Sequence, residues 1–542
     1  MPPTDPSGGP ESALTALGDE PSLRLLQELV AIAPTNLEDL AGDRFEKPNY
    51  PRAADAIVRA ARASGLATRI FDPLLETEDA RRLKNIPRPN VIVDLDAGAR
   101  ETVLILAHYD VVPVPAEQRA RWKSPPHTLT QRADGRLYGR GANDDLGSGV
   151  VTSLLAMRRL AALETVPRNV RLLVCCDEET GGEGGIEAIR EHDAHLPPDD
   201  PARLLRAEVA LIPDGGPETT AGSSGVAFLE ASFAHPVPLR QALEYGLALV
   251  SVHELARSWR SVYPSPDWPE RNAPEPVITG RASLTRFDLA EVSPGETLRL
   301  VEAHAETDAA NQIPRAVTLV FAGPAGERDA LARQLGSLLP PPFRLEASGP
   351  SSLRPLPGTL ALQVVGDAAH GGYPHRGHNP VPAALSLLRS AAERGYVDPL
   401  PTGRATFTVD LRLPPEMELS DGLGRAMAFL QDWARSHDDA ARVEAPPARC
   451  RPGYALPIDH PAAVKLAWIL ASTLGSHGIQ GEYGGTDASA LRGLTTPAGD
   501  PLPALVFGSM DPNAHIHDAE ESVDPRKIAG VAQAIERFVR EP

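Results

Sequence analysis

The sequence predicts an α/β fold in which a largely parallel sheet is interrupted by an inserted α+β domain. Two observations support this prediction. In the first and last parts of the chain, short apolar runs typical of strands buried on both faces alternate with helical stretches. The middle of the chain mixes strand-like and helix-like segments without that alternation. The first domain is therefore expected to be discontinuous in sequence.

The apolar runs are short and continuous, which favours buried strands over amphipathic ones. They cover residues 103–107, 170–174, 209–212 and 504–507. Apolar residues at helical spacing lie before and between them, and predict helices at residues 21–32, 53–63, 147–163, 185–192 and 462–474. This order of strands and helices is the one that builds a parallel sheet with helical crossovers.

The middle region predicts a separate domain with its own strands and helices. Its expected strands are residues 225–233, 317–321, 360–365 and 404–413, and its expected helices are residues 239–257, 327–338 and 381–392. We therefore expect a flexible tail at residues 1–20, an inserted domain at residues 220–453, and a first domain formed by residues 21–219 and 454–542.

Composition excludes several classes of protein. The chain has 542 residues, with 53 Lys and Arg against 72 Asp and Glu, so its formal charge is −19. Such an acidic balance argues against a general binder of nucleic acid or of anionic membranes. No apolar run approaches the roughly 20 residues of a membrane span, and we expect no signal peptide in the first 20 residues. Three cysteines make no disulfide framework, so we expect a cytoplasmic protein.

Side chains able to bind metals or transfer protons follow each apolar run. Ligands of open α/β sheets bind outside the carboxyl ends of the strands, which is where these residues fall. They are His108 and Asp110, Asp177 to Glu179, Asp214, and His515 and His517, with Asp144 and Asp145 in a glycine-rich segment before a predicted helix. Histidine and carboxylate ligands suit zinc, and carboxylates can bridge the two ions of a hydrolytic dinuclear site.

The spacing of His108 and Asp110 assigns them different roles. A strand period of two places both side chains on one face. Asp110 can then hold the far nitrogen of His108 and orient the ring, while His108 itself binds metal.

Three motifs make the chain resemble a known family. They are His108-Tyr109-Asp110-Val111-Val112-Pro113, Gly139-Arg140-Gly141-Ala142-Asn143-Asp144-Asp145 and Asp177-Glu178-Glu179-Thr180-Gly181-Gly182. They resemble the dinuclear zinc hydrolases that include acetylornithine deacetylase, succinyl-diaminopimelate desuccinylase, carboxypeptidase G, aminoacylase and several dipeptidases. The resemblance spans residues 20 to 535 and implies a zinc-peptidase catalytic domain with an inserted lid domain.

The resemblance also implies roles for individual residues. Asp144 matches the carboxylate that bridges two Zn²⁺ ions, for which Co²⁺ or Mn²⁺ could substitute. The remaining metal ligands are implied to be His108 and Asp214 for one ion and Glu179 and His517 for the other, with Glu178 as general base. Two alternatives stay open: His515 could replace His517, and Asp145 could be a plain helix-capping residue.

The middle region resembles the lid of the same family. Gly366-Asp367-Ala368-Ala369-His370 matches the motif whose histidine stabilises the oxyanion. Asn311, Arg412 and Gly485 match positions that contact substrate, and a structural ion pair is the alternative for Arg412. Their order resembles the monomeric bacterial dipeptidases, whose enlarged lid supplies this histidine within one chain, so we expect a monomer.

These implications define the expected function. We expect a metallopeptidase that hydrolyses amide bonds in small peptides with a free carboxylate, with dipeptides as the first candidates. An N-acyl-amino-acid deacylase is the alternative within the same class. A catalytically silent, metal-stabilised binding protein is the alternative from another class, against which the complete ligand set and Glu178 argue.

Overall fold

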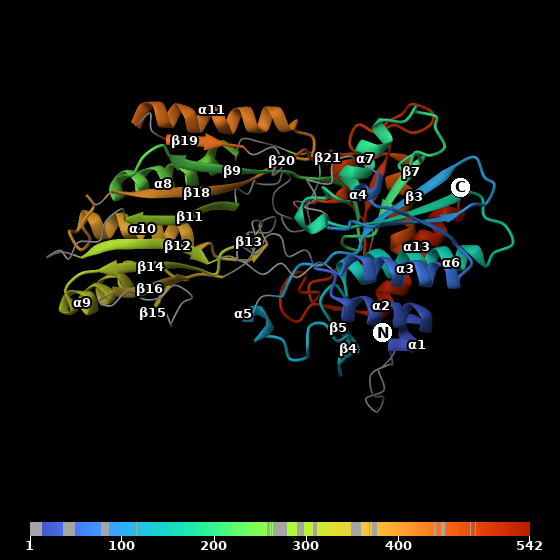
Figure 1. Ribbon diagram of the computed structural model, residues 1–542, viewed down its shortest axis with the longest axis horizontal. Coiled ribbons are helices and arrows are strands. Elements are labelled where there is room, and N and C mark those ends of the chain that lie inside the picture. The colour runs from blue at the N-terminus through green and yellow to red at the C-terminus, as the bar shows by residue number, and fades with distance from the viewer. Residues whose placement is uncertain are drawn as a thin grey trace. The chain divides into compact units, whose positions relative to one another are not determined.

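The structure, a computed structural model, contains two compact units (Figure 1). Unit 1 comprises residues 1–222, 454–481 and 486–542, and unit 2 comprises residues 223–453 and 482–485. The structure describes residues 13–35, 49–76, 86–114, 116–256, 261, 263, 279–289, 298–306, 312–347, 359–367, 369–370, 377–400, 402–437, 441–445, 450–476, 478–482 and 484–542.

A nine-stranded mixed sheet forms the centre of unit 1. Its strands are β1 (Ala67–Phe71), β2 (Asn90–Leu95), β3 (Thr102–His108), β6 (Asn169–Cys175), β7 (Val209–Ile212), β8 (Thr219–Ser223), β21 (Tyr454–Ala455), β22 (Ile479–Glu482) and β23 (Ala504–Val506). The order is β1-β2-β6-β3-β7-β23-β8-β21, with β22 beside β8. A separate three-stranded sheet contains β4 (Thr130–Gln131), β5 (Leu137–Tyr138) and β24 (Ser522–Val523).

The parallel strands lie at the middle of this sheet. Strands β6, β3, β7 and β23 pair in parallel, and they correspond to the four apolar runs of the sequence. Strands β1, β2 and β8 add to them antiparallel. The predicted α/β fold is therefore confirmed, with parallel pairing confined to the centre. Parallel strands end in the same direction, so the residues after β3, β6, β7 and β23 meet at one edge.

Helices complete unit 1. They are α1 (Ala13–Leu17), α2 (Glu20–Ile32), α3 (Tyr50–Ala63), α4 (Pro73–Glu76), α5 (Ala116–Arg119), α6 (Thr152–Ala161), α7 (Ile186–Ala194), α12 (Pro461–Thr473) and α13 (Pro525–Arg540). Helix α13 packs against α6 and α12, and α2 packs against α3. The end of the predicted tail folds as α1, where Leu17 is 1 % exposed. Residues 1–12 lie outside the described residues.

Among its described residues, unit 1 also contains three short non-α helices, two of which carry candidate site residues. A π-helix, η1 (Asp144–Val151), precedes α6, and the 3₁₀ turns η2 (Glu178–Thr180) and η5 (Asp487–Leu491) follow later. The sequence predicted one α-helix for residues 147–163, and the structure instead divides this segment between η1 and α6. Gly147 fits the close backbone here, because a Cβ at this position would collide with the Ala142 carbonyl oxygen.

Unit 2 is built on a ten-stranded sheet whose described pairings are antiparallel. Its strands are β9 (Gly225–Phe233), β10 (Val237–Pro238), β11 (Thr279–Leu289), β12 (Arg299–Glu306), β14 (Ala316–Ala322), β15 (Arg344–Ala347), β16 (Thr359–Val365), β18 (Thr402–Leu413), β19 (Ala441–Glu444) and β20 (Cys450–Arg451). A two-stranded sheet pairs β13 (Gln312–Ile313) with β17 (Ala369–His370).

The helices of unit 2 pack on this sheet around one apolar core. They are α8 (Leu239–Ala256), α9 (Ala325–Gly336), α10 (Pro380–Glu393) and α11 (Leu419–His437). Helices α8 and α10 contact each other and the central strand β11. The antiparallel sheet with helices matches the α+β character predicted for the insertion.

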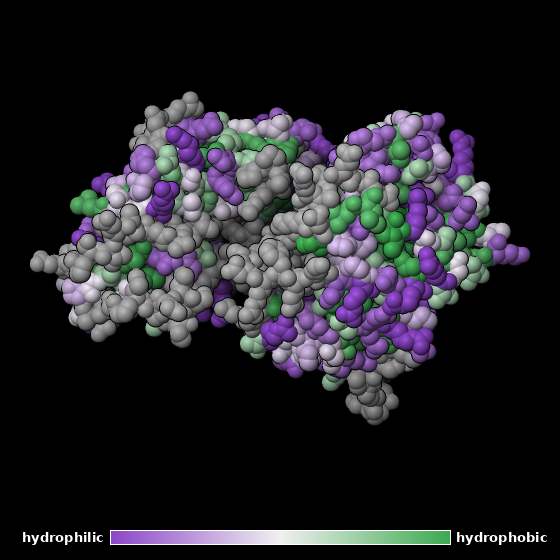
Figure 2. Space-filling view, in the orientation of Figure 1, coloured by the Kyte–Doolittle hydropathy of each residue, from purple (hydrophilic) through white to green (hydrophobic). Residues whose placement is uncertain are grey.

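Hydrophilic residues cover much of the face seen in Figure 2, with hydrophobic residues between them. Large exposed apolar side chains are few among the described residues, and Trp468 on α12 is 75 % exposed. Within the described part of the chain, none of the helices combines the length and the apolar character needed to span a bilayer.

Candidate metal centre

His108 is the last residue of the central strand β3, at the carboxyl edge of the sheet where the candidate site lies. Its side chain is 4 % exposed. Its Nε2 atom lies 3.7 Å from Asp214 Oδ2, after β7, and 3.6 Å from Asp145 Oδ1, in η1. The sequence-distant residues meet because β3 and β7 are parallel neighbours that end at the same edge.

Asp110 connects His108 to the turn that carries the two glutamates. Its Oδ1 atom lies 3.3 Å from His108 Nδ1. The Asp110 carboxylate also accepts the backbone N–H groups of Glu178 and Glu179, each at 3.1 Å. One buried carboxylate therefore orients the imidazole and holds the turn η2.

A second anchor of η2 is Asp177, the residue before Glu178. Its backbone is left-handed, with φ +61°, a conformation in which non-glycine residues need support from their surroundings. The Tyr50 hydroxyl donates to the Asp177 carboxylate at 2.9 Å, and Arg88 forms a buried ion pair with the same carboxylate. These contacts hold the start of the turn.

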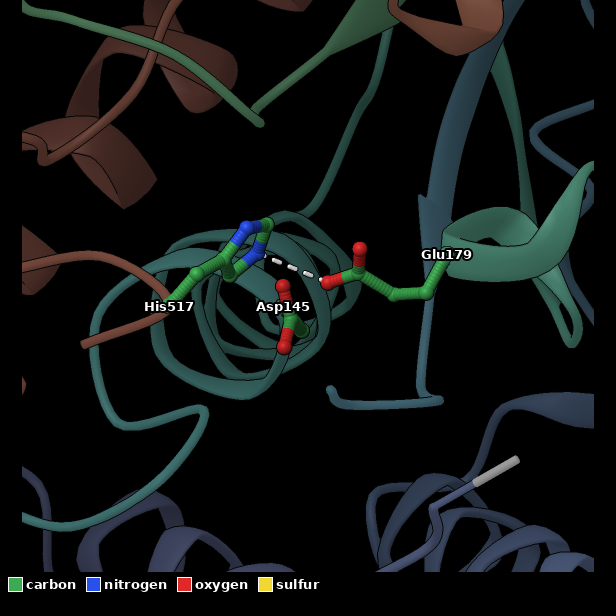
Figure 3. A group of neighbouring side chains, drawn as sticks. All are labelled: Asp145, Glu179 and His517. Atoms are coloured by element: carbon green, nitrogen blue, oxygen red, sulfur yellow. Dashed lines mark ion pairs between the residues drawn. The ribbon is translucent and has the colours of Figure 1, made fainter. Parts of the chain in front are cut away.

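Asp145, Glu179 and His517 form a compact group (Figure 3). Each offers one ligand atom, and these atoms lie within 4.8 Å of one another. His517 Nε2 and Glu179 Oε1 are 2.8 Å apart. In Figure 3 the imidazole faces the Glu179 carboxylate, and the Asp145 carboxylate lies beside them. His515, the alternative to His517, is exposed.

Asp145 belongs to both halves of the site. Its carboxylate lies 3.6 Å from His108 Nε2 and within 4.8 Å of the ligand atoms of Glu179 and His517. Its side chain is buried, and its Oδ1 atom has no hydrogen-bond partner among the described residues. The Asp144 side chain, predicted as the bridging ligand, lies outside what the structure describes. A metal would satisfy the buried Asp145 oxygen, so the donor set fits divalent cations that accept nitrogen and oxygen ligands.

The electrostatics of the group favour positive charge. Burial opposes the charged form of His517, but Glu179 outweighs this effect and raises the pKa of His517 to about 9. Burial likewise opposes a charged His108, yet Asp110 and Asp214 raise its pKa well above the usual value. The carboxylates therefore favour positive charge at this position, which a bound divalent cation would also supply.

The two glutamates of η2 differ. Burial raises the pKa of Glu178 well above its usual value, and Asp487 and Glu179 add to this effect. Burial would also raise the pKa of Glu179, but the His517 imidazole outweighs burial and lowers it. The lowered pKa favours the ionised form of Glu179, which is the form that binds metal. Glu178 holds a proton readily, as a residue that accepts and returns protons must.

The predicted lid residues lie in unit 2. The backbone of His370 pairs with that of Gln312 in the β13–β17 sheet, so the two lid motifs are neighbours. The side chain of His370, and Asn311 altogether, lie outside the described residues. Arg412 is buried and donates to both oxygens of Asp410, at 2.8 and 3.0 Å. Arg412 therefore forms the structural ion pair that was the alternative to a contact with substrate. A Cβ added at Gly485 would lie 3.5 Å from Val226 Cγ2, an ordinary van der Waals distance.

Asp145 is the residue whose place at the site the sequence did not predict. The adjacent carboxylates Asp144 and Asp145 both indicate a metal ligand at this point of the sequence. The family motif gives the bridging role to Asp144 and leaves Asp145 as a possible helix cap. Which carboxylate of such a pair faces the site depends on the helical register. Residues in a π-helix are rotated relative to the same residues in an α-helix, so the motif alone does not determine the direction of either side chain.

A mixed α/β sheet with histidine and carboxylate side chains at the carboxyl ends of its central parallel strands is typical of metal-dependent α/β hydrolases. The chain belongs to peptidase family M20/M25/M40, whose family model matches residues 104–541. The resemblance drawn from the motifs is thereby confirmed.

Relatives within this family bear different names. The chain is 36 % identical over 119 residues to the cysteinylglycine-S-conjugate dipeptidase of Corynebacterium striatum, covering 22 % of this chain and 24 % of that protein. It is 30 % identical over 234 residues to the succinyl-diaminopimelate desuccinylase of Delftia acidovorans, covering 41 % of this chain and 52 % of that one. These matches span about a quarter to a half of the relatives' length.

Solved structures share the fold over nearly the whole chain. The M20 family metallo-carboxypeptidase Sso-CP2 of Sulfolobus solfataricus aligns with a TM-score of 0.54 and 14 % identity, covering 96 % of this chain and 99 % of that one. The di-peptidase Dug1p of Saccharomyces cerevisiae aligns with a TM-score of 0.52 and 14 % identity, covering 98 % of both chains.

Proposed function

We propose that the protein hydrolyses the amide bond of small substrates with a free carboxylate, with dipeptides as the preferred class. The observation that carries this proposal is the position of Asp145, whose carboxylate lies 3.6 Å from His108 Nε2 and within 4.8 Å of the ligand atoms of Glu179 and His517. A carboxylate between two groups of ligands is what a dinuclear site requires. Family membership supports amide hydrolysis as the reaction.

The ligands are divided between two zinc sites in this proposal. His108 and Asp214 hold one ion, and Glu179 and His517 hold the other. The Asp144-Asp145 pair supplies the shared carboxylate: the motif favours Asp144, and the contacts of the described side chains favour Asp145. Divalent ions at such ligands polarise a carbonyl and lower the pKa of a coordinated water. Co²⁺ or Mn²⁺ can replace zinc at sites of this chemistry.

Glu178 is the general base of the proposed reaction. It accepts the proton of the attacking water and then returns that proton to the leaving amine. Burial raises the pKa of Glu178, which supports the first of these steps, the acceptance of a proton from water. Asp110 fixes the position of Glu178 through its backbone N–H and orients the His108 ring.

The lid residues bind substrate in the proposal. His370 stabilises the oxyanion, and Asn311, Arg412 and Gly485 contact the substrate. Arg412 donates to both oxygens of Asp410, and in this proposal the same guanidinium also contacts the substrate. We propose that the protein acts as a monomer. The three cysteines are free thiols, which supports the reducing cytoplasm as its compartment.

A panel of substrates tests this function. The purified protein, loaded in turn with zinc, cobalt and manganese, is assayed on dipeptides and on N-acetyl and N-succinyl amino acids. Faster turnover of dipeptides supports the proposal, and faster turnover of acylated amino acids favours the deacylase alternative. A protein that binds two metals but hydrolyses none of these amides, with or without chelator, would be the silent binding protein instead.

A matched pair of variants tests the shared ligand. Asp144→Asn and Asp145→Asn remove one charge each from adjacent positions, and elemental analysis gives the zinc content of both. The residue that bridges the ions loses zinc on substitution, while its neighbour retains two ions. Unchanged zinc content in both variants contradicts the assignment of this pair.

A further inference from the structure

Glu521 closes the motif His517-x-x-x-Glu521, and the proposed reaction assigns it no role. Its side chain is 1 % exposed and pairs with the fully buried Arg140 at 2.6 Å. Arg140 belongs to the glycine-rich motif that ends in Asp144 and Asp145. The ion pair therefore joins two segments that each carry proposed metal ligands.

The segment that carries His517 has an unfavourable backbone. His515, His517 and Glu520 all have positive φ angles, of 51°, 62° and 69°. This conformation is uncommon for residues with a side chain, and surrounding contacts help to hold them in it. The orientation of the His517 ring thus depends on what holds this segment in place.

Arg140 contributes to that support through a second residue, Gln118. It donates to the side-chain oxygen of Gln118, whose amide nitrogen donates to the carbonyl oxygen of His517 at 2.8 Å. A continuous chain of hydrogen bonds therefore leads from the guanidinium to the backbone of the proposed ligand. Both Arg140 and Gln118 are buried, so water does not compete strongly for these bonds.

Glu521 reaches the other ligand segment as well. Its second carboxylate oxygen lies 3.4 Å from the backbone nitrogen of Asn143, which precedes Asp144 and Asp145. The Asn143 side chain donates to the carbonyl oxygen of Ser522 at 2.9 Å. Several donors of the glycine-rich motif therefore bind the segment that follows His517, and the spacing of the two segments determines how far His517 lies from the Asp144-Asp145 pair.

We propose that the Glu521–Arg140 pair is a positioning device that sets this spacing and so the affinity of one metal, the ion held by Glu179 and His517. The inference rests on the proposed function, because it needs the dinuclear site. The contacts of the pair are with ligand segments and not with the proposed ligand atoms. Supporting contacts of this kind change metal affinity by roughly 10- to 100-fold.

The test uses two variants of the full chain and a control. Glu521→Gln keeps the side-chain shape but leaves the Arg140 charge buried without its partner, which can impair folding. The double variant Arg140→Met, Glu521→Leu removes both charges, an exchange that often preserves stability. Arg121→Gln is the control, because Arg121 pairs with Asp518 beside His517 but both side chains are about half exposed.

Zinc affinity is measured by competition with a chromogenic chelator, Co²⁺ spectra report the ligand geometry, and thermal melts report folding. We expect the wild type and Arg121→Gln to bind two ions. The folded double variant should bind one ion normally and the second roughly 10- to 100-fold more weakly, with an altered Co²⁺ spectrum.

A folded double variant with two ions at wild-type affinity overturns the positioning role alone. A wild type that does not bind two ions overturns the proposed function, and the positioning role with it.

Discussion

The carboxylate of Asp110 accepts the backbone N–H of Glu178 at 3.1 Å. The same carboxylate holds Glu179 and lies 3.3 Å from the His108 ring. The proposed general base and two proposed metal ligands are thus positioned by one side chain that is fully buried. The geometry of the site depends on this carboxylate as much as on the ligands themselves.

Asp110→Asn should weaken metal binding. The Asn side chain offers one acceptor oxygen in place of two, so it cannot satisfy both backbone N–H groups and His108. We expect a roughly 10- to 100-fold loss of zinc affinity, measured by chelator competition. Asp94→Asn serves as control, because Asp94 pairs with Arg171 on strands β2 and β6. Equal affinity in both variants would show that Asp110 has no orienting role.

Glu178→Gln should separate metal binding from catalysis. Glutamine keeps the shape of the side chain but cannot accept a proton from water. We expect both zinc ions to remain and kcat to fall by roughly 10²- to 10⁴-fold, with zinc content and steady-state kinetics as the measurements. Full activity in this variant would refute the general-base assignment.

Arg88→Met should destabilise unit 1. The Arg88 and Asp177 side chains are 2 % and 4 % exposed, so the substitution leaves a buried carboxylate without its cation. Such losses cost about 3–5 kcal/mol of unfolding free energy, which urea denaturation measures. Arg59→Gln removes the exposed pair with Glu28 and should cost less than about 1 kcal/mol. Similar losses in the two variants would contradict this difference.

Removing metal should lower stability as well as activity. Bound ligands stabilise the native state by about 4 kcal/mol at a thousandfold excess over Kd. The carboxylates of Asp145, Glu179 and Asp214 gather close to one another, so chelation also removes the charge that screens them. We expect a chelator to lower the melting temperature and zinc to restore it. A melting temperature insensitive to chelator argues against a bound dinuclear centre.

A mixture of inactive variants tests the source of the lid histidine. If His370 serves the site of its own chain, a mixture of His370→Ala and Glu178→Gln should stay as inactive as each variant alone. Light scattering should show single chains throughout. Recovery of activity on mixing would mean that one chain completes the site of another, and the proposed monomer would then be wrong.

The parallel centre of the sheet could be predicted because its strands are continuous apolar runs. The run at residues 170–174 lies within β6, and the run at residues 209–212 is β7.

Strands without a continuous apolar run were not predicted. Strand β2 includes the charged residue Asp94, which pairs with Arg171, and so lacks the continuous apolar pattern of a central strand.

At the candidate site, too, some features could be predicted from the sequence and others could not. Motif and strand order placed His108, Glu179, Asp214 and His517 at one edge, and the structure brings their described side chains into one cluster. The contact of Arg412 with Asp410 required coordinates, since the same sequence allowed a substrate ligand or an ion pair. A residue type determines what a side chain can bind, while its neighbours determine what it does bind.

Sequence patterns were enough to identify the family and the central strands, and they supplied a candidate set of metal-binding residues. Tertiary structure decided which partners those residues meet. Arg140 and Glu521 are 381 residues apart in sequence, and only the packing of their segments brings them together. The π-helical turn likewise directs Asp145 into the cluster. Apolar periodicity and motif spacing are local properties of a chain, whereas buried ion pairs and side-chain direction depend on contacts between distant segments.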